Sequence, residues 1–355
     1  MVQKSYAWLS TDRILDDDCK VRIVYEWLWE ILRSCLLTLN NIMFSVDSPW
    51  DRLTTAVVGS CWSPSRFDWV DYHVRQHLEI IAQETQEDLD ALASLLVTLG
   101  VQVLRPNLDC VPNSVLPPVA PRDDLILLHN RLCVQSNSRA PGYQHIVDLA
   151  RGQDVIITRP SAPDIHGANV LDLPDCVYYS VDHIEDLPQA EHWFEQYVAK
   201  PRRRYYNTGH LDGWWCIPTP GVIAASRDHA QHALQKFFFK QHFPDHTVLY
   251  LNETFAGTLD RKWHSDQHPP HSEFAQWVNA TIPSWVGCAA ETVFEINILI
   301  IDHTLVITGQ DHPELRDLLK QKGCHLLVAP LRHQTFWDLG IHCATADLAR
   351  IRNSN

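Results

Sequence analysis

The sequence predicts an α/β fold. Strand-like and helix-like segments alternate along the chain, and one local pattern recurs: a helical run ends near a glycine, a short strand of β-branched residues follows, and a proline often stops it. Regular alternation of strands and helices is typical of α/β proteins. Five such units favour radial or stacked repetition, although an ordinary doubly wound sheet produces the same local pattern.

The clearest unit spans residues 84–106. Its leucines recur at helical spacing: Leu89, Leu92, Leu95, Leu96 and Leu99. Gly100 follows and can adopt the left-handed conformation that ends a helix. Residues 101–104 then predict a strand, and Pro106 ends the unit.

The same pattern predicts four further units, of which the middle two are looser. They span residues 145–160, 186–206, 228–251 and 312–330. Gly152 and Gly323 are the predicted breaks in the first and last of them. Strands are also expected before several of the helices, at residues 56–58, 222–225 and 305–307.

Residues 1–42 match none of these units and are expected to be an extension that the remaining domain, 43–355, does not need. Three aspartates, 16–18, precede an amphipathic run in this segment. The apolar stretch 21–39 carries four charged residues, too many for a membrane span, and no secretory signal opens the chain.

Composition excludes several classes of partner. The 43 acidic and 29 basic residues give a net charge of −14, which argues against nucleic acid. A glycine-rich phosphate loop does not follow any predicted strand, so we expect no nucleotide cofactor. The ten cysteines include no CxxC pair, which predicts neither a zinc ribbon nor a disulfide framework and favours a cytoplasmic protein.

Three distant segments contain residue types that suit nucleophilic catalysis. Cys343 follows His342 in a loop after the last predicted unit. His210 and Asp212 alternate in an extended segment, so their side chains share a side, and Asp123 precedes a buried-looking strand. A thiolate, an acid/base and an orienting carboxylate are what such catalysis requires.

At these positions the sequence resembles the amidinotransferases, a family of the pentein superfamily. The resemblance runs in order from about residue 50 to residue 350. It rests on five segments: Trp50-Asp51-Arg52-Leu53 with 57–59, Pro121-Arg122-Asp123 with Asn130, 208–212 with 220–222, Asn297-Ile298-Leu299, and 340–347. The last segment, which contains Cys343, is the most specific match.

The resemblance implies a pentein α/β-propeller of five ββαβ blades around a central active-site channel. It implies that Cys343 attacks the guanidinium carbon of L-arginine and that His210 moves protons to the leaving ornithine and from an amine acceptor. Asp212 and Asp123 would hold the guanidinium, whose N–H donors suit carboxylates. Glycine is the default acceptor, and a homodimer is compatible with the family.

Further residues are expected at the substrate, and some depart from the family pattern. Arg122, Asn297 and His342 belong to the matching segments. His166 and Asn169 stand where the family has two acids; Asp164 could supply the missing acid, and Glu295 adds a carboxylate near the expected pocket. The residues 338–340 replace a run of glycines.

These departures leave two alternatives open. One is a guanidine hydrolase of the arginine deiminase type, and the other is a catalytically inactive pentein that acts as a binding module. A further cluster, His264, His268 and His271, has helical spacing, but Pro269 and Pro270 break a helix there. We therefore expect a lid in that segment, and no metal or cofactor in the protein.

Overall fold

The computed structural model describes residues 44–158, 165–181, 183–198, 202–206, 209–226, 232–251, 268–286 and 296–352. The chain divides between Met43 and Phe44 into two units, and all the described residues lie in the second. None of the helices in the described part of the chain combines the length and the apolar character that a membrane crossing needs.

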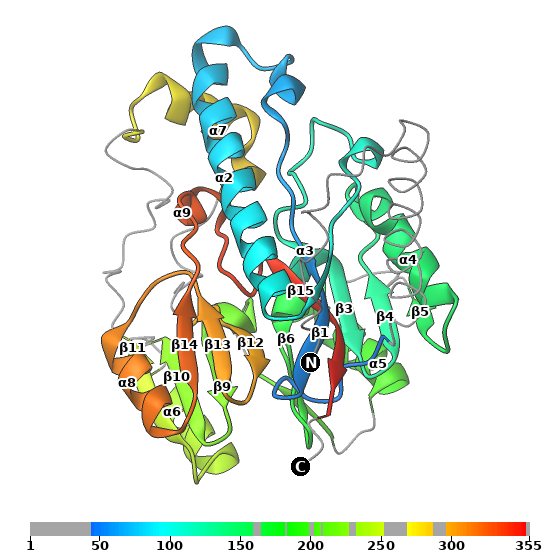
Figure 1. The fold of residues 1–355 in the computed structure, drawn as a ribbon, viewed down its shortest axis with the longest axis vertical. Coiled ribbons are helices and arrows are strands. Elements are labelled where there is room, and N and C mark those ends of the chain that lie inside the picture. Colours follow the sequence, from blue (N-terminus) through cyan, green and yellow to red (C-terminus); the bar gives the residue numbers. More distant parts are fainter. Residues whose placement is uncertain are drawn as a thin grey trace, which may run out of the picture. The chain divides into compact units, whose positions relative to one another are not determined.

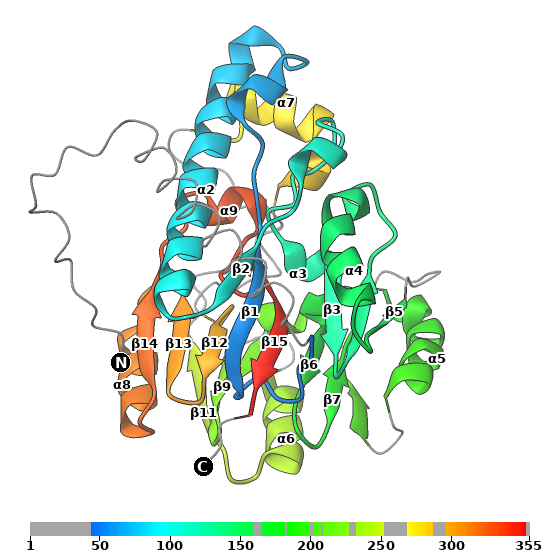
Figure 2. The same cartoon turned by 45° about the vertical axis from the view of Figure 1, so that its right-hand side comes forward.

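Fifteen strands of the described residues form five sheets of three strands each (Figures 1 and 2). In every sheet the first two strands are antiparallel and the third is parallel to the second. Four sheets follow one another along the chain: β3 (Leu125–Leu128), β4 (Arg131–Val134) and β5 (Ile156–Thr158); β6 (Val170–Asp172), β7 (Val177–Tyr179) and β8 (Arg203–Tyr205); β9 (Trp215–Thr219), β10 (Val222–Ser226) and β11 (Thr247–Leu251); β12 (Leu299–Asp302), β13 (Leu305–Thr308) and β14 (His325–Val328).

A helix joins the second strand to the third in each sheet, as parallel pairing requires. These helices are α4 (Gln144–Arg151), α5 (Leu187–Tyr197), α6 (His232–His242), α8 (Pro313–Gln321) and α2 (Tyr72–Thr98). The other helices of four or more α-helical residues are α3 (Pro121–Asp124), α7 (Glu273–Thr281) and α9 (Gln334–Trp337). Each sheet is therefore one ββαβ unit.

The fifth unit closes the ring with strands from both ends of the domain. β15 (Thr345–Ile351) pairs antiparallel with β1 (Arg52–Val58), which pairs parallel with β2 (Gln102–Leu104). The two strands β1 and β15 lie side by side in both views (Figures 1 and 2). The five-bladed fold that the pentein resemblance implies is confirmed.

The structure also confirms the predicted helix-to-strand units and explains two of the glycines. Gly100 and Gly323 have φ angles of +82° and +75°, a left-handed conformation that L side chains disfavour. They end α2 and α8 just before β2 and β14. Of the predicted leucines, Leu89, Leu92 and Leu96 are buried on the inner face of α2.

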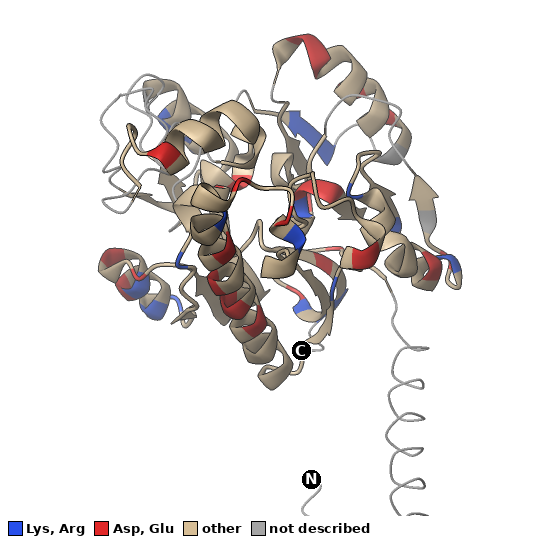
Figure 3. Ribbon diagram, turned by 90° about the horizontal axis from the view of Figure 1, so that it is seen from above, with Lys and Arg blue, Asp and Glu red and all other residues tan. Residues whose placement is uncertain are grey.

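Helix α2 supports the segment that leads to Cys343. Its acidic residues are visible along the long helix in Figure 3, and Glu84, Glu87 and Asp88 pair with Arg332, which lies two residues before α9. Trp337 in α9 donates a hydrogen bond to the hydroxyl of Thr85 at 2.7 Å. Ion pairs at the surface and a buried hydrogen bond thus tie α9 to α2.

Candidate active site

Every blade contributes one side chain from the segment that enters its first strand. Asp123 precedes β3, His166 precedes β6, His210 precedes β9, Asn297 precedes β12 and Cys343 precedes β15. The first strands neighbour one another around the ring, since β15 contacts β3 and β12 contacts β9. Because the five blades repeat one topology, equivalent loops bring residues that are distant in sequence to one end of the ring.

Asn297 holds Cys343 through two hydrogen bonds. Its side-chain amide donates to Cys343 Sγ at 3.0 Å, and its carbonyl oxygen accepts from the Cys343 backbone N–H at 3.0 Å. The loop lies close to Asn297 because residue 340 is a glycine: a Cβ there would lie 2.3 Å from the Asn297 side chain. Asn297 therefore contacts the cysteine itself.

Asp212 accepts two hydrogen bonds on a single oxygen. His342 Nδ1 donates to Asp212 Oδ2 at 2.7 Å, and the Cys343 thiol donates to the same oxygen at 3.2 Å. The other oxygen, Asp212 Oδ1, is buried without a partner among the described residues. Burial alone would raise the pKa of Asp212, but the hydrogen bond and charge of His342 and the charge of His210 hold it below its usual value.

The surroundings of Cys343 favour a neutral thiol. Burial raises its pKa well above the ordinary value, and the carboxylates of Asp212 and Asp123 raise it further. The hydrogen bond from Asn297 acts in the opposite direction but is outweighed. A cation bound between the carboxylates would reverse the balance, because it would favour the thiolate.

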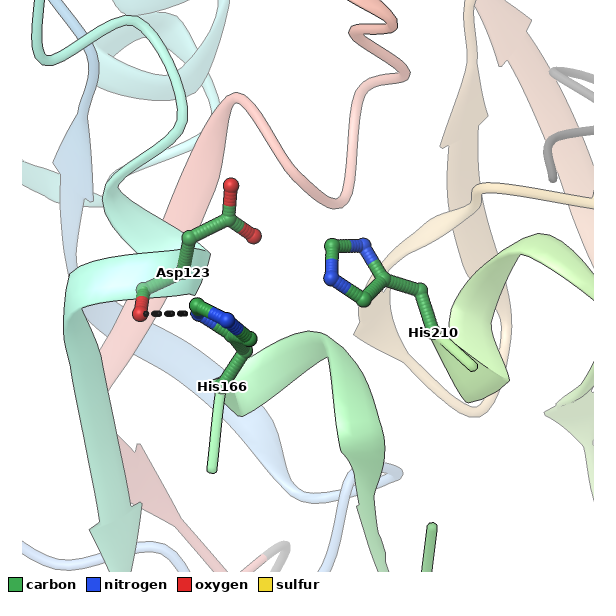
Figure 4. Close-up of side chains that lie close together, drawn as sticks. All are labelled: Asp123, His166 and His210. Carbon is green, nitrogen blue, oxygen red and sulfur yellow. Dashed lines mark hydrogen bonds between the residues drawn. The ribbon is translucent and has the colours of Figure 1, made fainter. Parts of the chain in front are cut away.

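Asp123, His166 and His210 form a second cluster (Figure 4). One potential ligand atom from each lies within 4.8 Å of the other two, and the two imidazole centroids are 5.3 Å apart. His166 Nδ1 donates to the backbone carbonyl of Asp123 at 3.0 Å. Burial raises the pKa of Asp123, although His210 and His166 act to lower it, and Asp123 Oδ1 is buried without a partner in the described part of the chain.

Asn169 positions the two histidine loops. Its side-chain carbonyl accepts the backbone N–H of His166 at 3.1 Å, and its amide donates to the Ser180 hydroxyl at 3.2 Å. Ser180 in turn donates to the carbonyl of Gly209, the residue before His210. Asn169 is fully buried. This series of hydrogen bonds links the loop of His166 to the loop of His210.

Arg122 is engaged with the nucleophile segment. Its guanidinium donates to Asp347 at 2.7 Å and to the carbonyl of Thr345 at 3.1 Å. Arg350 also pairs with Asp347 at 2.7 Å. The structure thus places Arg122 in a largely buried ion pair that anchors the start of β15, directly after Cys343.

Sequence reasoning did not find the ion pairs that support the site. Asp347 falls in the matching C-terminal segment and Arg350 follows three residues later, but neither carries a distinguishing local pattern. Arg139 binds the buried carboxylate of Asp124 through Nη2 at 2.7 Å, and Tyr143 donates to the same carboxylate at 3.0 Å. These contacts hold Asp124 in place in α3. Its neighbour Asp123 is the acidic residue that lies in the site.

Asp164 and Glu295, and His264 of the histidine cluster, lie outside the described residues. Within the described part of that cluster, the His268 ring lies 4.9 Å from the ring of His77. The predicted lid in this segment stays a prediction.

A small cavity of about 40 Å³ lies beside the site, with Asp212 and His342 on its wall and Asp347 and Arg350 also lining it. A volume of this size is enough for a water molecule. The remaining lining is largely apolar and includes Ile296 and Trp215.

Known proteins that resemble this chain are amidinotransferases and related hydrolases, although no family model matches it. Inosamine-phosphate amidinotransferase 1 of Streptomyces griseus is 23% identical over 87% of this chain and 97% of that protein. Among solved structures, SxtG, an amidinotransferase of the saxitoxin pathway from Microseira wollei, has a TM-score of 0.60 at 14% identity and covers 88% of this chain and 99% of its own. DDAH from Pseudomonas aeruginosa, solved with citrulline, has a TM-score of 0.53 at 13% identity and covers 84% and 100%.

The sequence relatives and the fold agree. The chain has five ββαβ units, nearly full-length similarity to a curated amidinotransferase and a structural match to penteins at the level of the fold. The chain therefore has the five-bladed fold of the penteins, and its sequence is similar to that of amidinotransferases.

Proposed function

We propose that this protein transfers the amidino group of L-arginine to an amine acceptor through a covalent amidino-Cys343 intermediate, with release of ornithine. One observation carries the proposal: two carboxylates beside a buried thiol each have a buried oxygen with no partner in the described structure, Asp123 Oδ1 and Asp212 Oδ1. Buried anions that lack donors are costly, and a guanidinium supplies planar N–H donors together with a compensating charge.

The bound guanidinium would also activate the nucleophile. Its positive charge offsets Asp212 and Asp123, which oppose ionisation of Cys343 in the free enzyme. The thiolate then forms a C–S bond to the guanidinium carbon, while the thiol proton passes to His210. When the C–N bond to ornithine breaks, His210 returns this proton to the leaving nitrogen.

The second half of the reaction repeats these steps in reverse. An acceptor amine gives a proton to His210 and attacks the amidino carbon, and Cys343 leaves as the thiolate. The expected kinetics are ping-pong, since ornithine departs before the acceptor reacts. Glycine is the default acceptor, and an aminated cyclitol phosphate is a second candidate because a relative carries inosamine phosphate in its name.

A product assay tests the proposal. The purified chain is incubated with arginine alone, with arginine and glycine, and with arginine and inosamine phosphate; ornithine, citrulline and the amidinated acceptor are separated by chromatography. We expect acceptor-dependent ornithine that Cys343→Ala abolishes. Cys110→Ala is the matched control, because Cys110 is exposed and lies on a different loop.

The other outcomes decide between the alternatives. Citrulline formed without an acceptor would identify a guanidine hydrolase, in which water takes the place of the amine. If arginine binds and neither acceptor gives a product, the remaining readings are a different substrate pair and an inactive binding module. His166→Asp separates these cases further: higher turnover in this variant would show that His166 occupies a lost acidic position, whereas a large loss would show that the imidazole has its own role.

A further inference from the structure

We propose that Asp123, His166 and His210 form a binding site for a divalent transition metal ion of the zinc class. The three side chains come from three different blades and converge on one space (Figure 4). One ligand atom from each lies within 4.8 Å of the other two. A tetrahedral zinc site needs these atoms about 3.4 Å apart, given Zn–N and Zn–O bonds of roughly 2.0–2.2 Å, so the three side chains would have to approach one another by up to about 1.4 Å.

The hydrogen bond of His166 fixes which ring nitrogen carries the proton and therefore which one can bind a metal. Nδ1 lies 3.0 Å from the backbone carbonyl of Asp123, and a carbonyl only accepts, so Nδ1 carries the proton. In the neutral ring this tautomer leaves the lone pair on Nε2. Histidines that bind metals commonly donate their other N–H to a carbonyl or carboxylate, which orients the ring and raises its basicity.

The carboxylate supplies the third ligand and the negative charge. Asp123 Oδ1 is buried and has no hydrogen-bond partner in the described structure, which is costly for an anion. A divalent cation would satisfy it. Two imidazoles and one carboxylate form a donor set that zinc uses in sites with three protein ligands and one open position.

The site shares Asp123 and His210 with the proposed reaction, but two features distinguish it from the cysteine itself. Cys343 Sγ is engaged with Asn297 and Asp212, and the three proposed ligands do not include it. The site also depends on His166, which stands where the resemblance places an acid. The inference therefore does not rest on the proposed function. If that function holds, the metal and the substrate compete, because a metal-bound His210 has no lone pair to accept a proton.

Calorimetry with Zn²⁺ tests the site. The full chain, without a polyhistidine tag and stripped with a chelator, is expected to bind one Zn²⁺ per chain. His166→Asn keeps a donor near the Asp123 carbonyl but removes Nε2, and should weaken binding by about 100-fold or more, since even outer-shell changes cost roughly 10- to 100-fold. His325→Asn is the matched control, because His325 is exposed on β14, and it should bind as the wild type does.

Co²⁺ provides a second readout that needs no enzymatic activity. Visible ligand-field bands should appear in the wild type and in Cys343→Ala, without sulfur-to-cobalt charge transfer, and should be lost in His166→Asn and Asp123→Asn. Circular dichroism shows whether each variant is folded. The proposal is overturned if wild-type protein binds no Zn²⁺ at micromolar concentrations, if binding survives His166→Asn, or if it requires Cys343.

Discussion

Replacing Asp212 by Asn should make Cys343 more reactive toward an alkylating agent while abolishing turnover. Asp212 Oδ2 lies 3.2 Å from the sulfur, and its charge is one of the causes that raise the pKa of the thiol, after burial. At this distance a unit charge opposes ionisation by about 5 kcal/mol if the effective dielectric constant is about 20. Asn keeps an acceptor for His342 and adds a donor for the sulfur.

The expected decrease in the pKa of Cys343 is about 1 to 3 units, because opposing dipoles and solvent reduce the full Coulomb energy. Since the thiol is mostly protonated at neutral pH, each unit raises the thiolate fraction about tenfold. The assay is the rate of iodoacetamide alkylation of the Cys343 peptide, followed by mass spectrometry from neutral to alkaline pH. Asp317→Asn is the control, because Asp317 is exposed on α8.

The opposite result would refute this reasoning. If Asp212→Asn slows alkylation or leaves its rate unchanged, the carboxylate promotes ionisation of the thiol and acts as its base. The role assigned to Asp212, a holder of the guanidinium that keeps the free thiol protonated, would then be wrong. Loss of turnover alone would not distinguish the two roles, so the alkylation rate decides between them.

Three further predictions concern stability. Arg122→Met should lower the free energy of unfolding in urea by about 3 kcal/mol, because it leaves Asp347 partly unpaired. Burial alone would raise the pKa of Asp347, but Arg350 and Arg122 hold it below its usual value, so the difference in unfolding free energy between variant and wild type should shrink as the pH falls below about 4. A difference that stays constant with pH would contradict the ion-pair explanation. Asp338 has a φ of +50°, which strains a β-branched side chain but not glycine. Asp338→Val should therefore lower the free energy of unfolding by about 1–3 kcal/mol, and Asp338→Gly should lower it much less. Equal decreases in the two variants, measured in urea, would exclude backbone strain as the cause. Deletion of residues 1–42 should leave the thermal midpoint nearly unchanged, and a large decrease in calorimetry would show that the domain needs them.

The repeating units could be predicted because their signals are local. Leucine spacing in 84–99 and the glycines after the helices report on backbone conformation within one turn. The first strands of the blades gave weaker signals. β9, for example, is buried at all five positions, so it lacks the alternation that marks a half-exposed strand.

The chemistry of the site was predictable in part. Residue types and motif order indicated Cys343, His210 and Asp123, but the contacts of Arg122 were not visible, since Asp347 lies 225 positions away in the sequence. The protonation state of Cys343 also depends on burial and on carboxylates from other blades. Such effects arise only when the blades assemble.

The pairing of β1 with β15 has a consequence for how the protein acquires its reactivity. Residues 52–58 pair with residues 345–351, so the last blade forms only after the two ends of the domain have met, and such long-range contacts slow folding. Until then Cys343 lacks the burial that suppresses its ionisation. Newly made chains should therefore pass through an interval in which this thiol is open to oxidation, and assembly of the ring protects it.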